Sequence, residues 1–589
     1  MKRHLSAVTL VLLFAASLGC SSKPGATAPV LARSAAWFAD PIAIFTDDVG
    51  TPEFEAYHDI GMGALSHGWA QPGVEGQQVS IQGYSSAAVS VLRGEYAHDP
   101  FKLAYRWLQG DDEGSTGEMS EIGTVTGWDE SATHRAPKCD AIFMLHTPIY
   151  NSIIELAVCY QVRGIPDDDV DEVLGENFHQ NPQYPDPDPE GWGESNDDWD
   201  IGLTILRWTQ EEFPEGQLQR IDYLIPDDGY LSQWGDFDPD LAYDHFSGDL
   251  YIVFSDAQTP GGVDRVFVKC VKLTRDNVHY PWYLDTTCWV ENHGWVSGWP
   301  ALVQPAPGGI PDHNGHDPSI DIGLLDFFIE GPPGQPGHWL EDRLWTAVSY
   351  TSQFEGGHCG YHVMAGGWPD GDLSSRFFWP LRQSDPGNPA LYELDSGLSC
   401  IDITPNQNDR NFAAVVFVQQ EGGDCYGPVM MVYEVDLFGL GQVIQPTPGV
   451  SNPYYRVTTE DFADGLFPSI SLHYGTGTSG PFYASITYMA QIQESNGLQP
   501  GVMRLEIEPV ESLYPPKLRV NHEAAWGPYA LDSVITGNYN ISQIPFIEPG
   551  MSTAILAFEG DYYWGVWCNR IEMESPPVTV WGTYGYTGI

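Results

Sequence analysis

The sequence predicts an all-β protein built from a series of small antiparallel sheets. Helical periodicity is nearly absent, whereas short apolar runs of strand length recur along the whole chain. The 63 glycines and 46 prolines separate these runs, as is typical of turns and loops. A third observation is an internal repeat, since the phrase EGGHCGY at residues 355–361 returns as EGGDCYG at residues 421–427.

The repeat is clearest in the first strand-like run of each unit, in which a small residue is followed by an apolar residue, any residue and another apolar residue. Its key apolar residue recurs in five units, as Leu241, Ile320, Ile401, Ile470 and Ile544. A second run follows in each unit and is apolar at nearly every position, as in LYIVFSD and FAAVVFVQ. Strands that are apolar on both sides are covered on both faces. Two earlier units fit the pattern more loosely, which brings the expected number of units to seven.

Small antiparallel sheets that cover one another on both faces resemble β-propellers as a superfamily. The resemblance implies that residues 37–589 form one seven-bladed β-propeller of four-stranded antiparallel blades with long loops. The two EGG phrases then occupy the same loop, between the second and third strands, in adjacent blades. No named family follows, because the sialidase-type Asp box and the WD and kelch signatures are absent.

The first twenty residues have the pattern of an export signal, with two basic residues and then a short apolar run. The segment SLGC at residues 17–20 resembles the lipobox of bacterial lipoproteins, which implies lipidation of Cys20 and anchoring in the cell envelope. Ser21 stands where an aspartate would retain such lipoproteins at the inner membrane, so the resemblance implies the outer membrane. Whether the protein is exposed at the cell surface or faces the other side stays open. Residues 21–36 would form a polar tether. The alternative is plain secretion with Cys20 removed.

Charge limits the partners of the protein. The chain has 80 acidic and 25 basic residues, for a formal net charge of −55. So negative a protein repels nucleic acid and anionic lipid head groups. The expected partners are therefore a membrane, reached through the lipid anchor, and a glycan or another surface protein.

The cysteines suggest disulfides. Without Cys20, eight of the nine cysteines remain in an oxidising compartment. Cys139 and Cys159 are symmetric about the turn HTPIYNS, and Cys270 and Cys288 about His279 in the segment RDNVHYP. Both pairs are expected to be cross-strand disulfides. The sequence does not connect the remaining cysteines, which are Cys359, Cys400, Cys425 and Cys568.

An acidic insertion at residues 163–200 contains DPDPEGWGESND, which resembles a D-x-D-x-D-G calcium loop. Alternating oxygen ligands converge in such loops, and the glycine at position six permits the sharp turn. The expected calcium ligands are Asp186, Asp188, Glu190, Glu194 and Asp197. The alternative is a solvated acidic turn, and no other cofactor is expected.

A second candidate site is the segment DHNGHD, just before the first strand of the fourth unit. The loop that carries the first EGG phrase would bring His358 to the same face of the propeller. Three imidazoles and two carboxylates could then hold a transition metal or act as acid and base. The residues concerned are Asp312, His313, His316, Asp317 and His358. The alternative is a set of solvated loop histidines.

Two classes of function remain open. The first is a non-catalytic surface module that binds a glycan or a protein through the channel face. Loop tryptophans such as Trp192, Trp234 and Trp295 could stack on sugar rings, although packing between blades is the commoner fate of such residues. The alternative is a carbohydrate-active enzyme, either a glycoside hydrolase or a polysaccharide lyase.

The calcium loop leads to a first prediction. Because a cation that binds only the folded chain stabilises it, calcium at a hundred times its dissociation constant should add ~2.7 kcal/mol to the free energy of unfolding. Thermal melts with calcium, magnesium or chelator at constant ionic strength should show a calcium-specific shift. Asp186→Ala/Asp188→Ala should lose that shift. Equal shifts in both proteins would identify simple screening of the net charge.

Overall fold

Every element that the computed structural model describes is a strand. The described residues are the strands given below and a few positions beside them, namely 119–122, 125, 132, 199, 210–217, 225, 244, 248–249, 331–337 and 457. This confirms the all-β prediction. Over the same residues, no helix offers a candidate membrane span.

The first described sheet has eight strands and consists of two antiparallel meanders. They comprise β3 (Glu55–Trp69), β4 (Tyr84–Arg93), β5 (Phe101–Gln109) and β6 (Gly123–Thr124), then β7 (Thr133–Leu145), β8 (Ile153–Arg163), β9 (Asp200–Thr209) and β10 (Gln219–Leu224). The two meanders meet where residues 65–69 of β3 pair in parallel with residues 141–145 of β7. Each meander is thus a four-stranded unit in its own right.

Four further sheets follow in chain order, each an antiparallel meander. The first comprises β11 (Asp236–Tyr243), β12 (Leu250–Gln258), β13 (Arg265–Leu273) and β14 (Ala301–Leu302). The second comprises β15 (His313–Ile329), β16 (His338–Phe354), β17 (His358–Gly366) and β18 (Phe377–Arg382). The third comprises β19 (Cys400–Asn406), β20 (Arg410–Gln420), β21 (Tyr426–Asp436) and β22 (Gly439–Val443), with β23 (Tyr455–Arg456) beside β21. The fourth comprises β24 (Asp464–Tyr474), β25 (Phe482–Gln491), β26 (Leu498–Val510) and β27 (Lys517–Ala530).

The last sheet contains both ends of the described chain. It is formed by β28 (Thr553–Phe558), β29 (Tyr562–Asn569) and β30 (Thr579–Tyr586), with β1 (Trp37–Phe38) and β2 (Ile42–Phe45) paired on the outer side of β30. The earliest strands therefore complete the sheet that the latest strands begin.

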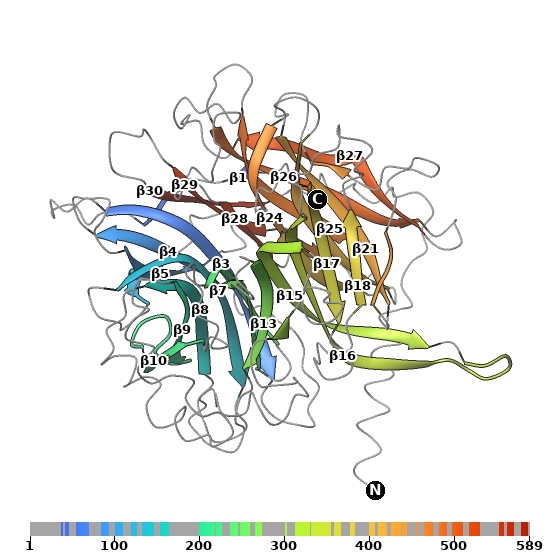
Figure 1. Ribbon diagram of the computed structural model, residues 1–589, viewed down its shortest axis with the longest axis horizontal. Helices are drawn as coiled ribbons and strands as arrows, with labels where there is room; N and C mark the ends of the chain where they lie inside the picture. Colours follow the sequence, from blue (N-terminus) through green and yellow to red (C-terminus); the bar gives the residue numbers. More distant parts are fainter. Residues whose placement is uncertain are drawn as a thin grey trace, which may run out of the picture.

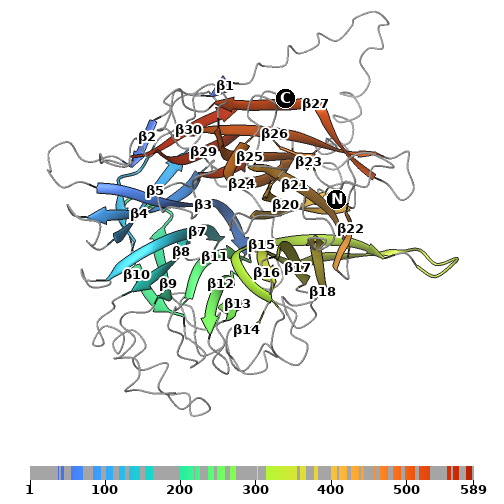
Figure 2. The same ribbon diagram turned by 45° about the horizontal axis from the view of Figure 1, so that its top comes forward.

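The first strands of the units form a closed ring. In chain order, β3, β7, β11, β15, β19, β24 and β28 each contact the next, and β28 contacts β3. Figures 1 and 2 show the sheets arranged in this order around the molecule, from blue β3–β6 to red β28–β30. A closed ring of small antiparallel sheets is the arrangement of a β-propeller, as the repeat predicted.

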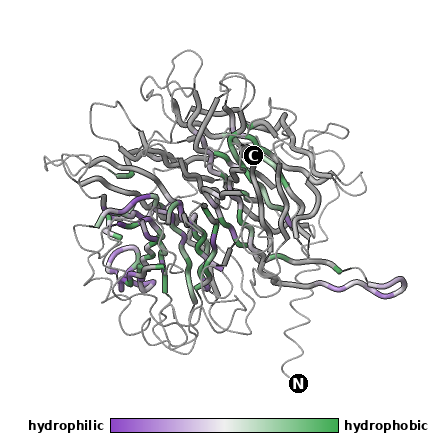
Figure 3. The backbone as a smooth tube through the Cα atoms, in the orientation of Figure 1, coloured by the Kyte–Doolittle hydropathy of each residue, from purple (hydrophilic) through white to green (hydrophobic). Residues whose placement is uncertain are grey.

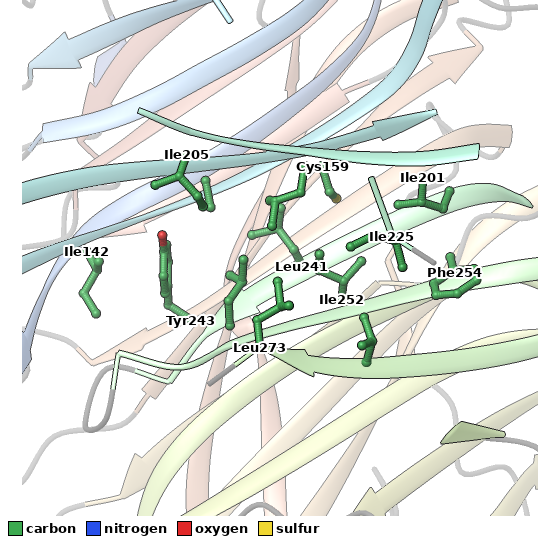
Figure 4. Packing of buried hydrophobic residues seen from close by; sticks show 14 of the residues in the cluster. Ile142, Cys159, Ile201, Ile205, Ile225, Leu241, Tyr243, Ile252, Phe254 and Leu273 are labelled. Carbon is green, nitrogen blue, oxygen red and sulfur yellow. The ribbon is translucent and has the colours of Figure 1, made fainter. Parts of the chain in front are cut away.

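Apolar residues fill the space between neighbouring sheets. The central strand β8 is buried at almost every position. One of its faces contributes Leu156 and Val158 to a cluster with β5, and its other face contributes Ala157 and Cys159 to a cluster with β11 and β12. Figure 4 shows this second cluster, with Cys159 and Ile205 facing Leu241 and Ile252. The prediction that the second strands are covered on both faces is confirmed for β8.

The predicted Cys139–Cys159 disulfide is wrong by one residue of register. In the β7–β8 ladder, Cys139 lies opposite Val158, and Cys159 lies opposite Lys138. A one-residue offset places two side chains on opposite faces of a sheet. The two buried cysteines accordingly belong to different clusters, and both are thiols.

The register predicted for Cys270 is also wrong. Cys270 is a buried thiol on β13, and the positions beside it are Val253 on β12 and Ala301 on β14. The fourth strand thus begins well after the tight hairpin that the sequence suggested. Cys288 lies outside the described residues, but because Cys270 is a thiol and lies opposite Ala301 on β14, the predicted cross-strand disulfide between Cys270 and Cys288 is wrong.

The packing of the second unit against the first leads to another prediction. Trp208 is fully buried and makes edge-to-face contacts with Trp107, at 5.4 Å between ring centroids, and with Tyr105, at 5.7 Å. Trp208→Ala should therefore lower the free energy of unfolding by about 3–5 kcal/mol, measured by thermal melting. Ile122→Ala is the control, because Ile122 is 42% exposed and its truncation should stay within about 0.5 kcal/mol. Similar losses in both variants would contradict the packing described.

Candidate functional site

The candidate site lies on the first strands of three adjacent units, where a carboxylate ties each strand to the next. On β7, Asp140 accepts a hydrogen bond at Oδ2 from the backbone N–H of Tyr243 on β11 (2.9 Å). Its Oδ1 accepts from the N–H of the following residue, Ala141 (2.8 Å). The carboxylate is thereby held in a fixed orientation beside the ring of first strands.

The same connection is made one unit further on. Asp240 of β11 accepts at Oδ2 from the N–H of Ile320 (3.0 Å) and from the hydroxyl of Ser319 (2.9 Å), both on β15. Its Oδ1 accepts from the N–H of Leu241 (3.0 Å). Two consecutive inter-unit contacts therefore use an aspartate as acceptor and a backbone amide as donor.

A proline bulge recurs at the same place in four of the first strands. The ladders between first and second strands change register across Pro137, Pro239, Pro318 and Pro468. Proline has no N–H to give to a ladder and is confined to such irregular positions. The residue after each proline is polar, and these four residues, called here the polar ring, are Lys138, Asp240, Ser319 and Ser469.

Burial raises the pKa values of both aspartates, and their neighbours oppose this increase to different extents. Burial raises the pKa of Asp140 to about 7, against the lowering effect of the two backbone N–H groups that donate to it. The charge of Asp240 adds to this increase. Burial also raises the pKa of Asp240, but Lys138 and the donated hydrogen bonds oppose the change. Both aspartates are half-buried and Lys138 is exposed, so the group is in reach of solvent.

Other buried charges lie inside single sheets. Arg207 donates from Nε to Oε1 of Glu155 at 2.5 Å, between neighbouring positions of β8 and β9. Lys269 of β13 pairs diagonally with Asp256 of β12, two residues beyond the position directly opposite it. All four side chains are buried, so these ion pairs serve the fold.

The strand positions of four residues in the predicted histidine group can be given from the backbone. His313, His316 and Asp317 belong to β15, although the sequence suggested a loop. His313 and His358 lie on either side of the same residue, Phe354 of β16, and His316 lies opposite Thr351. Asp312 is outside the described residues. Convergence of these groups stays a prediction.

The predicted calcium loop, residues 186–197, also lies outside the described residues and stays a prediction. Within the part of the chain that is described, no three His, Cys, Asp or Glu side chains are placed to hold a metal ion.

Sequence reasoning missed Asp140 and Asp240, although both lie in the repeat. The segment DPDLAYD was aligned on its apolar residue, Leu241, and the aspartate beside it was left without a role. An acidic residue within an otherwise apolar first strand was the available signal, because a carboxylate in that position must find hydrogen-bond donors.

No protein-family model matches the chain, and the curated proteins give no match either. Among solved structures, the chain is similar to an exo-1,5-α-L-arabinanase from a bovine ruminal metagenomic library, with 11% identity, a TM-score of 0.26 and coverage of 55% of this chain and 93% of that one. It is also similar to the GH93 α-L-arabinofuranosidase of Fusarium graminearum, with 9% identity, a TM-score of 0.31 and coverage of 73% and 89%. A third is the xylan β-1,4-xylosidase of Bacillus halodurans C-125, with 9% identity, a TM-score of 0.23 and coverage of 91% and 96%. Likenesses this weak carry no activity over to this chain.

The environment of Asp140 predicts a specific pH dependence of stability. Its carboxyl group has a pKa of about 7 in the folded protein and an ordinary value of 3.8. Between these values the folded state holds a proton that the unfolded chain has lost. The contribution of Asp140 to the free energy of unfolding should therefore fall as pH rises from about 4 to about 7, by at most ~1.4 kcal/mol per pH unit.

Denaturant melts across this range should show a shallower decline for Asp140→Asn than for the wild type. Ile122→Ala is the control, because Ile122 is exposed and has no titratable side chain, so the pH profile of this variant should follow the wild type. A parallel profile for Asp140→Asn would refute the raised pKa.

Proposed function

We propose that the protein is a cell-envelope lipoprotein whose seven-bladed β-propeller binds a glycan at the polar ring. The count of seven follows if each meander is one blade, with the eight-stranded sheet counted as two and the last sheet completed by β1 and β2. Lipidation at Cys20 and an outer-membrane location rest on the signal sequence. Calcium at residues 186–197 is part of the same proposal.

The observation that carries the proposal is the fixed orientation of the half-buried carboxylates beside an exposed ammonium group. Carboxylates accept hydrogen bonds from sugar hydroxyls, and Lys138 can donate to ring and hydroxyl oxygens. The backbone amides that hold Asp140 and Asp240 reduce the entropy that a flexible site would lose on binding. Polar groups with fixed positions are what a neutral, hydroxyl-rich ligand requires.

A neutral ligand also suits the charge of the chain. At a net charge of −55, an anionic polysaccharide would be repelled over a long range at low salt. We therefore expect neutral glycans to bind better than uronic acid polymers of the same length.

A second function is supported by the two aspartates themselves. Glycoside hydrolases use one protonated and one ionised carboxyl group, and their environments push the two pKa values apart. Asp140, with a pKa of about 7, and Asp240 beside it would fit the acid and the base of such a pair. The protein would then be a carbohydrate-active enzyme.

Titration calorimetry of the full chain against a panel of neutral and acidic polysaccharides tests the first function. Lys138→Ala should weaken binding at least about tenfold, since it removes an exposed charged donor at the polar ring. Arg220→Ala is the control, because Arg220 is 39% exposed and lies on the outer strand β10 of the same unit. Equal affinities for both variants would place the ligand elsewhere.

New reducing ends, measured on the same panel, separate the two functions. Binding without turnover supports the binding module. Turnover that Asp140→Asn abolishes while binding persists supports the hydrolase, and would overturn the first function.

A further inference from the structure

The first unit (β3–β6) and the last unit (β28–β30 with β1 and β2) meet where the ring of sheets closes. At the inner end of this contact, β3 lies against β28. At the outer end lies β2, whose residues Ile44 and Phe45 are fully buried. Figure 2 shows β2 next to β30 and near β5 of the first unit. The two strands β1 and β2 together are called here the strap.

The strap is attached to the last unit by a short ladder. Two residues of β1 and three of β2 pair with β30, whereas eight residues of β29 do so. The β2 ladder changes register between Ala43 and Phe45, so Ile44 is an extra residue. The extra residue of a β-bulge is left out of the pairing. Because Ile44 is buried, its carbonyl group needs a hydrogen-bond donor from elsewhere.

Arg106 of the first unit supplies that donor. Its Nη1 donates to the carbonyl oxygen of Ile44 at 2.6 Å, and its Nε donates to the carbonyl oxygen of Ser120 at 2.6 Å. Ser120 is itself fixed to β5, because its N–H donates to the carbonyl of Trp107 (3.0 Å) and its hydroxyl accepts from the N–H of Trp107 (3.0 Å). The guanidinium group thus joins the strap to a fixed point on the first unit.

This guanidinium group lies in apolar surroundings. Successive residues of a strand point to opposite faces, so Ala104, Arg106 and Leu108 share one face of β5. Ala104 and Leu108 are buried, and Figure 3 shows such hydrophobic stretches, in green, along the described strands. Burial lowers the pKa of Arg106, because it disfavours the charged form. The two carbonyl oxygens supply the acceptors that a partly buried charge requires.

We propose that the strap opens and closes as one element, and that Arg106 is the latch that holds it closed on the first unit. Segments with few stabilising contacts open locally, at a lower free energy than the unfolding of the whole protein. The short and bulged ladder of the strap fits this description, whereas the buried central strand β8 does not. Hydrogen bonds from a charged donor are stronger than neutral ones. Loss of the guanidinium group should therefore release the strap while the ring of first strands stays closed.

The latch also lies where the chain enters the propeller. The predicted tether, residues 21–36, leads directly into β1. A pull on a lipid anchor at Cys20 would therefore act first on the strap, and Arg106 would pass part of the load to the first unit. This load depends on the proposed lipid anchor, whereas the latch does not depend on it.

Hydrogen exchange of the full chain, followed by mass spectrometry, tests the latch. Arg106→Met removes the donors, so the amides of the strap should exchange at least about tenfold faster while those of β8 keep the wild-type rate. Arg106→Lys keeps the charge but lacks the planar fork that reaches both carbonyl oxygens, so its rates should fall between the two. Arg220→Met is the matched control, because Arg220 is exposed on β10. Unchanged exchange of the strap in Arg106→Met, or equal acceleration in β8, would overturn the proposal.

A second variant tests whether β1 and β2 open together. Phe45 is fully buried and belongs to β2, so Phe45→Ala removes apolar contacts from one half of the strap. If the strap is one element, the amides of β1 should accelerate by the same factor as those of β2. Acceleration confined to β2 would show two independent strands and refute the strap.

Discussion

The fold depends on the burial of both faces of each sheet. A sheet such as β7–β10, with a central strand buried at almost every position, cannot be stable at the edge of an open stack. It needs one neighbour for Leu156 and Val158 and another for Ala157 and Cys159. When every sheet has this need, closure into a ring is the arrangement that leaves no apolar face exposed, and the first strands do meet in such a ring.

Close approach of the first strands then restricts the residues that they can contain. A Cβ atom on Gly61 would lie 2.6 Å from the Cα atom of Lys138, and one on Gly63 would lie 2.5 Å from that of Asp140. Glycine is therefore required twice on β3, where β7 passes. The same crowding explains the aspartate ties, because the backbone amides of Tyr243 and Ile320 come within reach of side chains on the preceding strand.

The class of fold could be predicted from sequence because it follows from a pattern that tolerates small errors. The alternation of apolar runs and turn residues can still be recognised when a strand is misplaced by one or two positions. The prediction that β8 is covered on both faces was therefore correct although its register was not. Registers do not have that tolerance. A proline bulge adds one residue to β7 near Pro137, and the ladder beyond it pairs Cys139 with Val158. No local signal in the hairpin sequence distinguishes that register from the symmetric one.

The polar part of the candidate site was hidden for a related reason. The carboxylate of Asp240 accepts hydrogen bonds from Ser319 and Ile320. These residues are about eighty positions away in the sequence and become neighbours only when the first strands pack together. Acidic loops and histidine pairs attract notice in a sequence, since their residues are close together. A carboxylate that serves a neighbouring strand looks like one more acidic residue in a chain that has eighty.

The sheet that joins β1 and β2 to β30 sets the order of events during synthesis. The ladder hydrogen bonds of the units from β3 to β27 can form once their own strands have been made. The ring, however, lacks its last unit until β28 has been made, and that unit is complete only when β30 pairs with β1 and β2. Contacts of such sequence separation slow folding, because the ends of a very long loop must meet. Until then the outer faces of the first and last units expose apolar surface. The rate at which the ribosome releases the last strand therefore also determines how long the nascent protein is exposed to aggregation and to proteases.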